Sequence, residues 1–339
     1  MKKFFKKNKN IINIVVLIII TGIVLYIALK DDFSEIVNLV LNINVFYLII
    51  AFLLVILYWL LRSLALHTIT SKVKPDNKYR SSLQLMLRTQ FFNAVTPFST
   101  GGQPYQIYYL ARQGLSKTIS TNIILQNFIV YQIALVFLGI VAVASNFVFH
   151  IFNKVSLLQH LVLLGFIANT VVIIVMFIVS FSKKLNKKIV SIGILILTKL
   201  HLVKDKEKKL HDWNEYIDRF HKGAKILLSN KKDFIITILY NAVALVCLYA
   251  IPFALLCSMG DYNSYSVLVS VVTIAYVMLI GSFVPIPGAS GGLEYGFMSF
   301  YGNFIGGAKL KTIMLLWRFV TYYFGLIVGA IALNMKKVK

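Results

Sequence analysis

The chain contains few acidic residues. Among its 339 residues, 12 are Asp or Glu and 35 are Lys or Arg, so the formal net charge is +23. All of the acids except Glu294 fall in expected connections or at the ends of apolar stretches. A carboxylate at membrane depth is costly and is therefore a candidate functional group.

Cysteine is also scarce, and the common catalytic motifs are missing. Cys247 and Cys257 lie ten positions apart in one expected helix, about 15 Å, which is too far for a disulfide bond. The histidines have no metal-ligand spacing, and the chain contains no phosphate-binding loop, zinc-protease motif or serine-hydrolase motif. We therefore expect no metal and no cofactor.

Long apolar runs dominate what remains. The chain is 58% hydrophobic with a mean hydropathy of +0.78, which is typical of an integral membrane protein. The stretch after the basic N-terminus has no small-residue cleavage site, so we expect it to stay as an anchor. We predict an all-α, polytopic membrane helix bundle with about seven full spans: 11–29, 45–66, 119–144, 157–181, 234–256, 264–284 and 312–334.

Basic residues cluster in the connections, as expected for cytoplasmic loops. This places both termini, 67–90, 112–117 and 183–232 in the cytoplasm of a bacterial cell, and the protein in its cytoplasmic membrane. No nucleic-acid-binding module accompanies the charge, so we expect no nucleic-acid partner. Segment 91–111 then has to enter and return on one side, and segment 285–308 has to cross as a broken helix, giving eight crossings.

A proline- and glycine-rich motif occurs twice. The pattern Pro-x-x-Ser/Thr-Gly-Gly-x-Pro/Glu-Tyr lies at 97–105 and 287–295. Irregular backbone at membrane depth is tolerated only against protein or a water-filled cavity, and paired broken segments indicate a transporter site. We therefore predict one membrane domain, 1–339, with two repeats, about 11–181 and 234–335, joined by a basic connector, 183–232. The first repeat carries an extra basic amphipathic piece near 79–92.

Each motif precedes an expected helix, whose N-terminal N–H groups favour an anion such as a lipid phosphate. The alternative is that the glycines and prolines only form closely packed kinks. The candidate substrate-binding residues are Ser99, Thr100, Gly101, Gly102, Tyr105, Arg112, Ser290, Gly291, Gly292, Glu294, Tyr295 and Arg318.

Three roles are open for Glu294. It could carry a proton, pair with a cationic headgroup, or pair structurally with Arg318, which lies about a third of the way into the last span. Arg112 flanks the first motif and could guide a phosphate into it, or it could be ordinary cytoplasmic charge.

The two motifs resemble those of the lysylphosphatidylglycerol synthase transmembrane family, over roughly residues 10–335. This family is the flippase-like membrane domain at the N-terminus of the multiple peptide resistance factor. The resemblance implies movement of an aminoacylated phospholipid to the outer leaflet, and resistance to cationic peptides. In bifunctional relatives a separate C-terminal domain makes the lipid; we expect this chain, ending at Lys339, to lack it.

The leading hypothesis is therefore a lipid translocase for an anionic or aminoacylated phospholipid such as lysyl-phosphatidylglycerol. Membrane phospholipids and a separate lipid-modifying enzyme are the expected partners. One alternative is enzymatic, lipid-linked aminoacyl or glycosyl transfer of the phosphatidylglycerol lysyltransferase type. Others are a subunit that anchors a synthase through 183–232, and a flippase for another lipid or a glycolipid carrier.

Overall fold

The computed structural model describes residues 32–152, 156–199, 205–228, 230–281 and 284–336, and these residues form helices and connections without a strand. The predicted span 11–29 lies outside them. The helices are α3 (Phe33–Leu41), α4 (Val45–Ser71), α5 (Tyr79–Ala94), η1 (Pro97–Ser99), α6 (Gly102–Ala111), α7 (Lys117–Phe149), α8 (Ser156–Phe181), α9 (Lys183–Lys199), α10 (Lys206–Leu228), α11 (Lys231–Tyr249), α12 (Ile251–Ser258), α13 (Val267–Gly281), η2 (Pro287–Ala289), α14 (Gly292–Tyr301), α15 (Gly307–Arg318), η3 (Phe319–Tyr323) and α16 (Phe324–Asn334).

Long apolar helices confirm a multi-pass membrane protein. Within the described part of the chain, four stretches are long and apolar enough to cross a bilayer: α4, α7, α11 with α12, and α15 through α16. The first two contain the predicted spans 45–66 and 119–144. The third bends at Ala250 before Pro252, which lacks an N–H to continue the helix. The fourth contains a π-helical turn, η3. The 26-residue α8 covers the predicted span 157–181.

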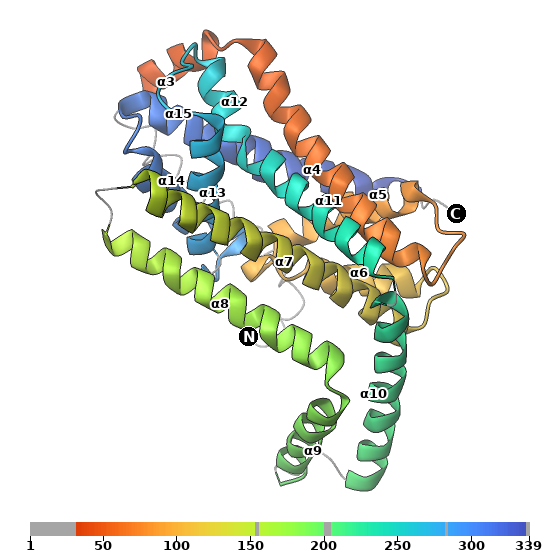
Figure 1. The fold of residues 1–339 in the computed structure, drawn as a ribbon. Coiled ribbons are helices and arrows are strands. Elements are labelled where there is room, and N and C mark those ends of the chain that lie inside the picture. The colour runs from red at the N-terminus through yellow and green to blue at the C-terminus, as the bar shows by residue number, and fades with distance from the viewer. Residues whose placement is uncertain (1–31, 153–155, 200–204, 229, 282–283, 337–339) are drawn as a thin grey trace, which may run out of the picture.

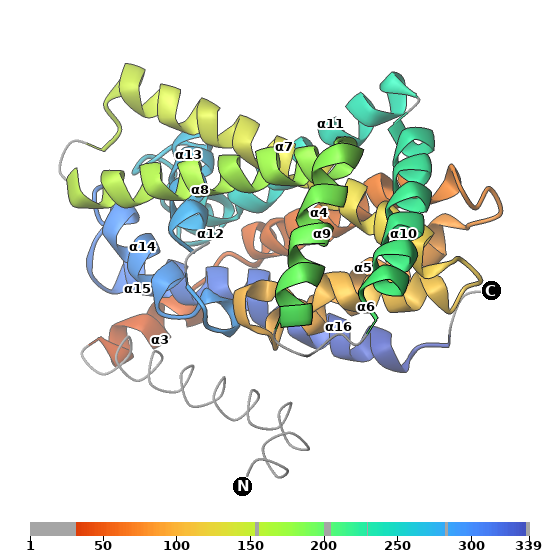
Figure 2. The ribbon, with the colours of Figure 1, turned by 90° about the horizontal axis from the view of Figure 1, so that it is seen from below.

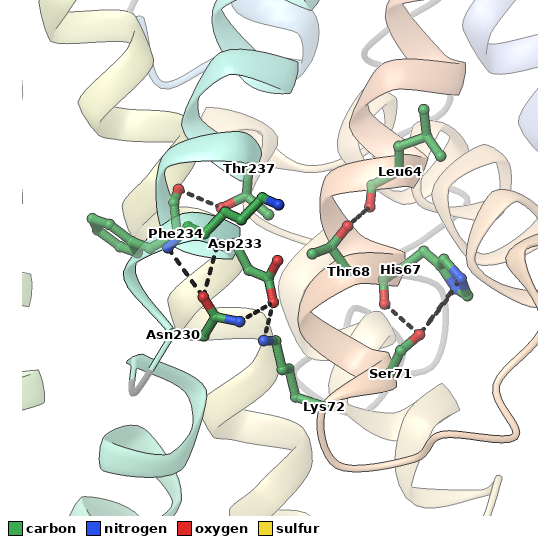
Figure 3. Close-up of polar contacts among 10 residues, drawn as sticks. Leu64, His67, Thr68, Ser71, Lys72, Asn230, Asp233, Phe234 and Thr237 are labelled. Carbon is green, nitrogen blue, oxygen red and sulfur yellow. Dashed lines mark hydrogen bonds and ion pairs between the residues drawn. The ribbon is translucent and has the colours of Figure 1, made fainter.

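Two neighbouring spans, α4 and α11–α12, run antiparallel. At one end Lys72 forms an ion pair with Asp233, whose carboxylate also accepts from Asn230 (Figure 3). At the other end the Asn44 N–H donates to the Ser258 carbonyl at 2.7 Å. The first end lies on the face that carries most lysines, which we call the lysine-rich face, and the second lies on the opposite face.

The segment α5–η1–α6 is a re-entrant hairpin rooted at the lysine-rich face. Its two arms are joined near their outer ends by Gln113, which donates to the Ser81 hydroxyl at 2.8 Å, and by Tyr109, which donates to Gln84 at 3.1 Å. The chain therefore enters and returns on one side, as predicted for 91–111.

The segment α13–η2–α14 is a second re-entrant hairpin, and it is rooted at the opposite face. Tyr301 at the end of α14 lies 3.1 Å from the Ser270 hydroxyl at the start of α13. The prediction that 285–308 crosses the membrane is therefore wrong. The predicted span 264–284 is also too long, because α13 has 15 residues, about 22 Å of helix. The hairpin enters and leaves at the same face and so takes the place of the two predicted crossings 264–284 and 285–308. The sidedness of the following chain is unchanged, and the last span still ends on the lysine-rich face.

The first hairpin packs closely against α16 (Figure 1). Arg88 of α5 is buried and donates to the carbonyls of Ala332 at 2.9 Å and Met335 at 2.7 Å, which closes the end of α16. Further in, a Cβ at Gly329 would lie 2.5 Å from the Phe91 nitrogen, so only glycine allows this approach. The helix α5 is thus a buried arm of the bundle.

The connector forms two helices, α9 and α10, that lie beside one another and extend from the lysine-rich face (Figures 1 and 2). Ile217 and Phe220 of α10 are buried, and Asn122 of α7 donates to the Phe220 carbonyl at 3.0 Å. Lys183 and Lys187 both contact Asp218, at 3.0 and 3.4 Å. These contacts lower the pKa of the Asp218 carboxyl, chiefly through the hydrogen bond from Lys183. The connector therefore packs against the bundle.

Candidate functional site

The two motifs meet inside the bundle. The tips η1 and η2 contact one another, although they enter from opposite faces. Their backbones agree at two successive residues and diverge at the next, where ψ is −9° at Thr100 and 142° at Ser290. Phe98 and Ser99 are left-handed at φ 54° and 53°, and Gly288 and Ala289 are left-handed at φ 65° and 50°. Such conformations in non-glycine residues are strained and cluster at functional sites.

An ion pair holds the second tip. The Arg318 Nε lies 2.7 Å from Glu294 Oε1, and both side chains are almost fully buried. Arg318 Nη2 donates to the Gly288 carbonyl at 3.0 Å and to the Ser290 hydroxyl at 3.1 Å. Glu294 Oε2 accepts from the Gly291 N–H at 2.6 Å, which caps α14. The pairing of Glu294 with Arg318, one of the three roles left open by the sequence, is therefore present, and it braces the motif.

Neutral side chains hold the first tip. The Thr96 hydroxyl oxygen accepts from the Gly101 N–H at 2.8 Å, and the Asn93 carbonyl oxygen accepts from the Gly102 N–H at 3.0 Å. Helices do begin directly after both turns, as predicted. Three of these N–H groups are not open to an anion in this conformation, because Thr96, Asn93 and Glu294 accept from Gly101, Gly102 and Gly291.

A central cavity of about 340 Å³ lies where the tips meet. Arg318 and Ser99 line it, and so does Trp317, whose buried Nε1 has no hydrogen-bond partner among the described residues. The other lining residues come from both halves of the chain: Val55, Tyr58, Trp59, Gln90, Phe98, Tyr131, Gln132, Leu135, Leu245, Leu248, Tyr249, Met278, Gly281, Val284, Gly288, Ala289, Leu293, Thr321 and Tyr322. The cavity therefore has polar donors, a cation and an apolar wall.

A second, apolar cavity of about 390 Å³ lies between α3 and the last span. Glu294 and Arg318 line it together with the apolar side chains of Ile36, Val40 and Phe319. Because Arg318 lines both cavities, the ion pair lies between a partly polar chamber and an apolar one.

The other predicted site residues are dispersed. Thr100 is exposed and donates to the Pro97 carbonyl, and Tyr105 stacks on Phe92 with ring centroids 4.2 Å apart. Tyr295 is 60% exposed, and Gly292 is the first residue of α14. Arg112 is exposed at the far end of α6, so the structure does not bring it to either cavity.

Arg62 and Gln90 were not among the site residues predicted from the sequence. Both lie on apolar or amphipathic helices in the first half, and they line cavities beside the first tip. A charge within an apolar run was the available signal for Arg62, which lies near the end of the predicted span 45–66.

The chain is similar to known proteins over nearly its full length. Residues 12–329 match the family model for the lysylphosphatidylglycerol synthase TM region. The chain is also 26% identical over 338 residues to a UPF0104 membrane protein of the archaeon Archaeoglobus fulgidus, covering 97% of both proteins. This match over nearly the full length shows that the chain belongs to the lysylphosphatidylglycerol synthase transmembrane-region family.

Proposed function

We propose that the chain is a lipid translocase that moves an anionic or aminoacylated phospholipid, such as lysyl-phosphatidylglycerol, between leaflets. The observation that carries this proposal is the central cavity at the meeting point of the two tips, with Arg318 in its wall. A guanidinium group is well suited to a phosphate, and cavities at the midplane between repeats are typical of transporters.

The adjoining apolar cavity supports a lipid rather than a soluble substrate. Its lining is mainly hydrophobic, and it shares Arg318 with the central cavity. A phospholipid has this same division, with a charged headgroup joined to apolar chains. In this proposal the headgroup enters the central cavity while the chains stay in apolar surroundings, and Glu294 balances the amino group of an aminoacylated headgroup.

Two equivalent halves support movement by alternating exposure. Gly292 begins α14 190 residues after Gly102 begins α6, and Gly307 begins α15 190 residues after Lys117 begins α7. The helix α5 then corresponds to α13, so it is not an extra piece of the first half. We propose that α4–α7 and α11–α16 are inverted repeats, and that rocking of one against the other exposes the cavity to each face in turn.

The test is movement of labelled phosphatidylglycerol and lysyl-phosphatidylglycerol in proteoliposomes. Wild-type protein should move at least one of them faster than empty liposomes. Glu294→Gln should abolish movement, whereas Arg80→Gln, an exposed arginine outside both cavities, should retain it. Insertion and folding are matched by size-exclusion chromatography of each reconstituted variant. Wild-type protein that moves neither lipid would reject this substrate class.

A further inference from the structure

A third, smaller chamber lies beside the first tip, toward the lysine-rich face. Its volume is about 60 Å³, enough for several water molecules when one needs about 10–15 Å³. The helices α4, α5, α6 and α7 all contribute to its wall. The lining residues are Tyr58, Arg62, Met86, Thr89, Gln90, Asn93, Gln103, Gln106, Ile124, Asn127 and Phe128.

Arg62 is the one charged group in this wall. Its Nε and Nη1 atoms are buried and have no hydrogen-bond partner among the described residues, and no described carboxylate lies within 4.0 Å of it. It lies nine residues before the end of α4 at Ser71, about 14 Å along the helix. An unpaired arginine so far inside a span is costly.

The nearest contact does not satisfy these donors. The guanidinium carbon lies 3.9 Å from the centroid of the Tyr131 ring, which stabilises the charge from one side. Tyr131 also interacts with the Arg62 side chain through its hydroxyl group, but Nε and Nη1 remain without an acceptor among the described residues, and unmade buried hydrogen bonds are unfavourable. By contrast, Arg88 donates to two carbonyls, and Arg318 binds Glu294.

The chamber also offers an acceptor. Asn127 is buried, and its Oδ1 has no donor among the described residues. The chamber therefore presents donors that lack an acceptor and an acceptor that lacks a donor. A phosphate ester of a polyol supplies both, because its phosphate oxygens accept and its hydroxyl groups donate.

We infer that this chamber binds a net anionic phosphate ester, with the phosphate on Arg62 and a hydroxyl group on Asn127. Tyr58 and Gln90 line both this chamber and the central cavity. The chamber is thus an intermediate binding site on the path of a headgroup from the lysine-rich face to the central cavity. This last step rests on the proposed translocase function, whereas binding itself does not.

Equilibrium binding of radiolabelled phosphatidylglycerol to the full chain in neutral detergent tests the inference. Arg62→Gln should weaken binding about tenfold or more, and Arg62→Lys should keep part of it. Asn127→Asp gives Arg62 the acid that it lacks, and should weaken binding similarly. Arg80→Gln should leave it unchanged. Thermal unfolding confirms that each variant is folded, and Asn127→Asp decides the matter if Arg62→Gln does not fold.

Competition identifies the source of the phosphate ester. Displacement by unlabelled phosphatidylglycerol, but not by glycerol 1-phosphate, indicates a lipid; equal displacement by both indicates a soluble ester. Equal displacement by phosphatidylcholine, or wild-type binding by both Arg62→Gln and Asn127→Asp, would overturn the inference. If lipid binding depends on Arg62 but no lipid moves in proteoliposomes, the binding site is supported and the proposed translocase function is rejected.

Discussion

The two re-entrant hairpins have the same turn at their tips but are held by different chemistry. The second tip is buried and fixed by the Glu294–Arg318 pair, whereas Phe98 at the first tip is 55% exposed and the turn is capped by neutral side chains. In the first half, Arg62 has no acidic partner among the described residues, and its Nε and Nη1 atoms have no acceptor there. A similar left-handed turn thus lies beside a fixed anchor in one half and beside a cationic chamber in the other.

The largest effect is expected from breaking the anchor. Glu294→Gln leaves the Arg318 charge buried without a counter-ion, which should cost about 3–5 kcal/mol of unfolding free energy. The double variant Glu294→Leu with Arg318→Met removes both charges and should recover most of this loss. Thermal unfolding in detergent measures both. Equal stability of the single variant and the wild type would show that the pair is not an anchor.

The next largest effect is expected at the left-handed residues of the two tips, Gly288 and Phe98. A Cβ at Gly288 would lie 2.3 Å from the Tyr322 ring, at a φ of +65°. Gly288→Ala should therefore lower the unfolding free energy by about 1–2 kcal/mol from the left-handed backbone alone, with a further loss from displaced Tyr322. Phe98→Gly at the equivalent position removes an exposed ring and should change stability by less than about 0.5 kcal/mol. Similar losses in both variants, measured by denaturant titration, would contradict this difference between the tips.

The neutral caps of the first tip should matter less than the ion pair. Thr96→Val removes the acceptor of the Gly101 N–H and should cost about 1 kcal/mol. Thr68→Val is a matched control, because the Thr68 hydroxyl donates only to the Leu64 carbonyl of its own helix. If the two variants have the same melting temperature, the cap at Thr96 does not hold the tip.

The smallest effect concerns the roots of the second hairpin. Asp261 contacts Lys309 at 2.8 Å, and this contact, followed by hydrogen bonds from Ser264, holds the pKa of the Asp261 carboxyl below its usual range. A depressed pKa stabilises the folded chain at neutral pH, and this contribution disappears as the pH falls through the folded-state pKa. Asp261→Asn should lower the melting temperature by a constant amount between pH 8 and 5. The difference should shrink only below about pH 4. A difference that disappears by pH 6 would contradict the assignment.

Much of the architecture follows from hydrophobic pattern alone. The runs at 45–66 and 119–144 are long and apolar, and each lies inside a single long helix, α4 and α7. The repeated motif also predicted irregular backbone at both tips, since only glycine, proline and short polar residues suit such turns. These features are local, so the sequence carries them directly.

Features that depend on contacts between distant parts of the chain could not be predicted from the sequence alone. The α13 run is as apolar as a span, but its length is limited by the return of α14, with Ser270 beside Tyr301. The stretch near 79–92 was predicted as an extra basic amphipathic piece, yet Arg88 within it is buried and donates to carbonyls 244 and 247 residues away. Arg62 looked like a span-end residue because its chamber is formed by helices that only the fold brings together.

The π-helical turn Phe319–Tyr323 has a consequence for insertions and deletions. A π turn holds one more residue than an α turn needs, and the corresponding stretch of α7 is continuous α-helix. Residue-by-residue alignment of the two halves therefore has to skip one position after Phe319. The π turn accommodates this residue locally, so deleting it should give a regular α turn and leave Gly329 against Phe91. Deleting a residue from the α-helical stretch between Phe324 and Gly329 should instead rotate the following residues by about 100° and turn Gly329 away from Phe91. The π turn thus lets the last span hold one more residue without changing which faces of α15 and α16 pack against their neighbours.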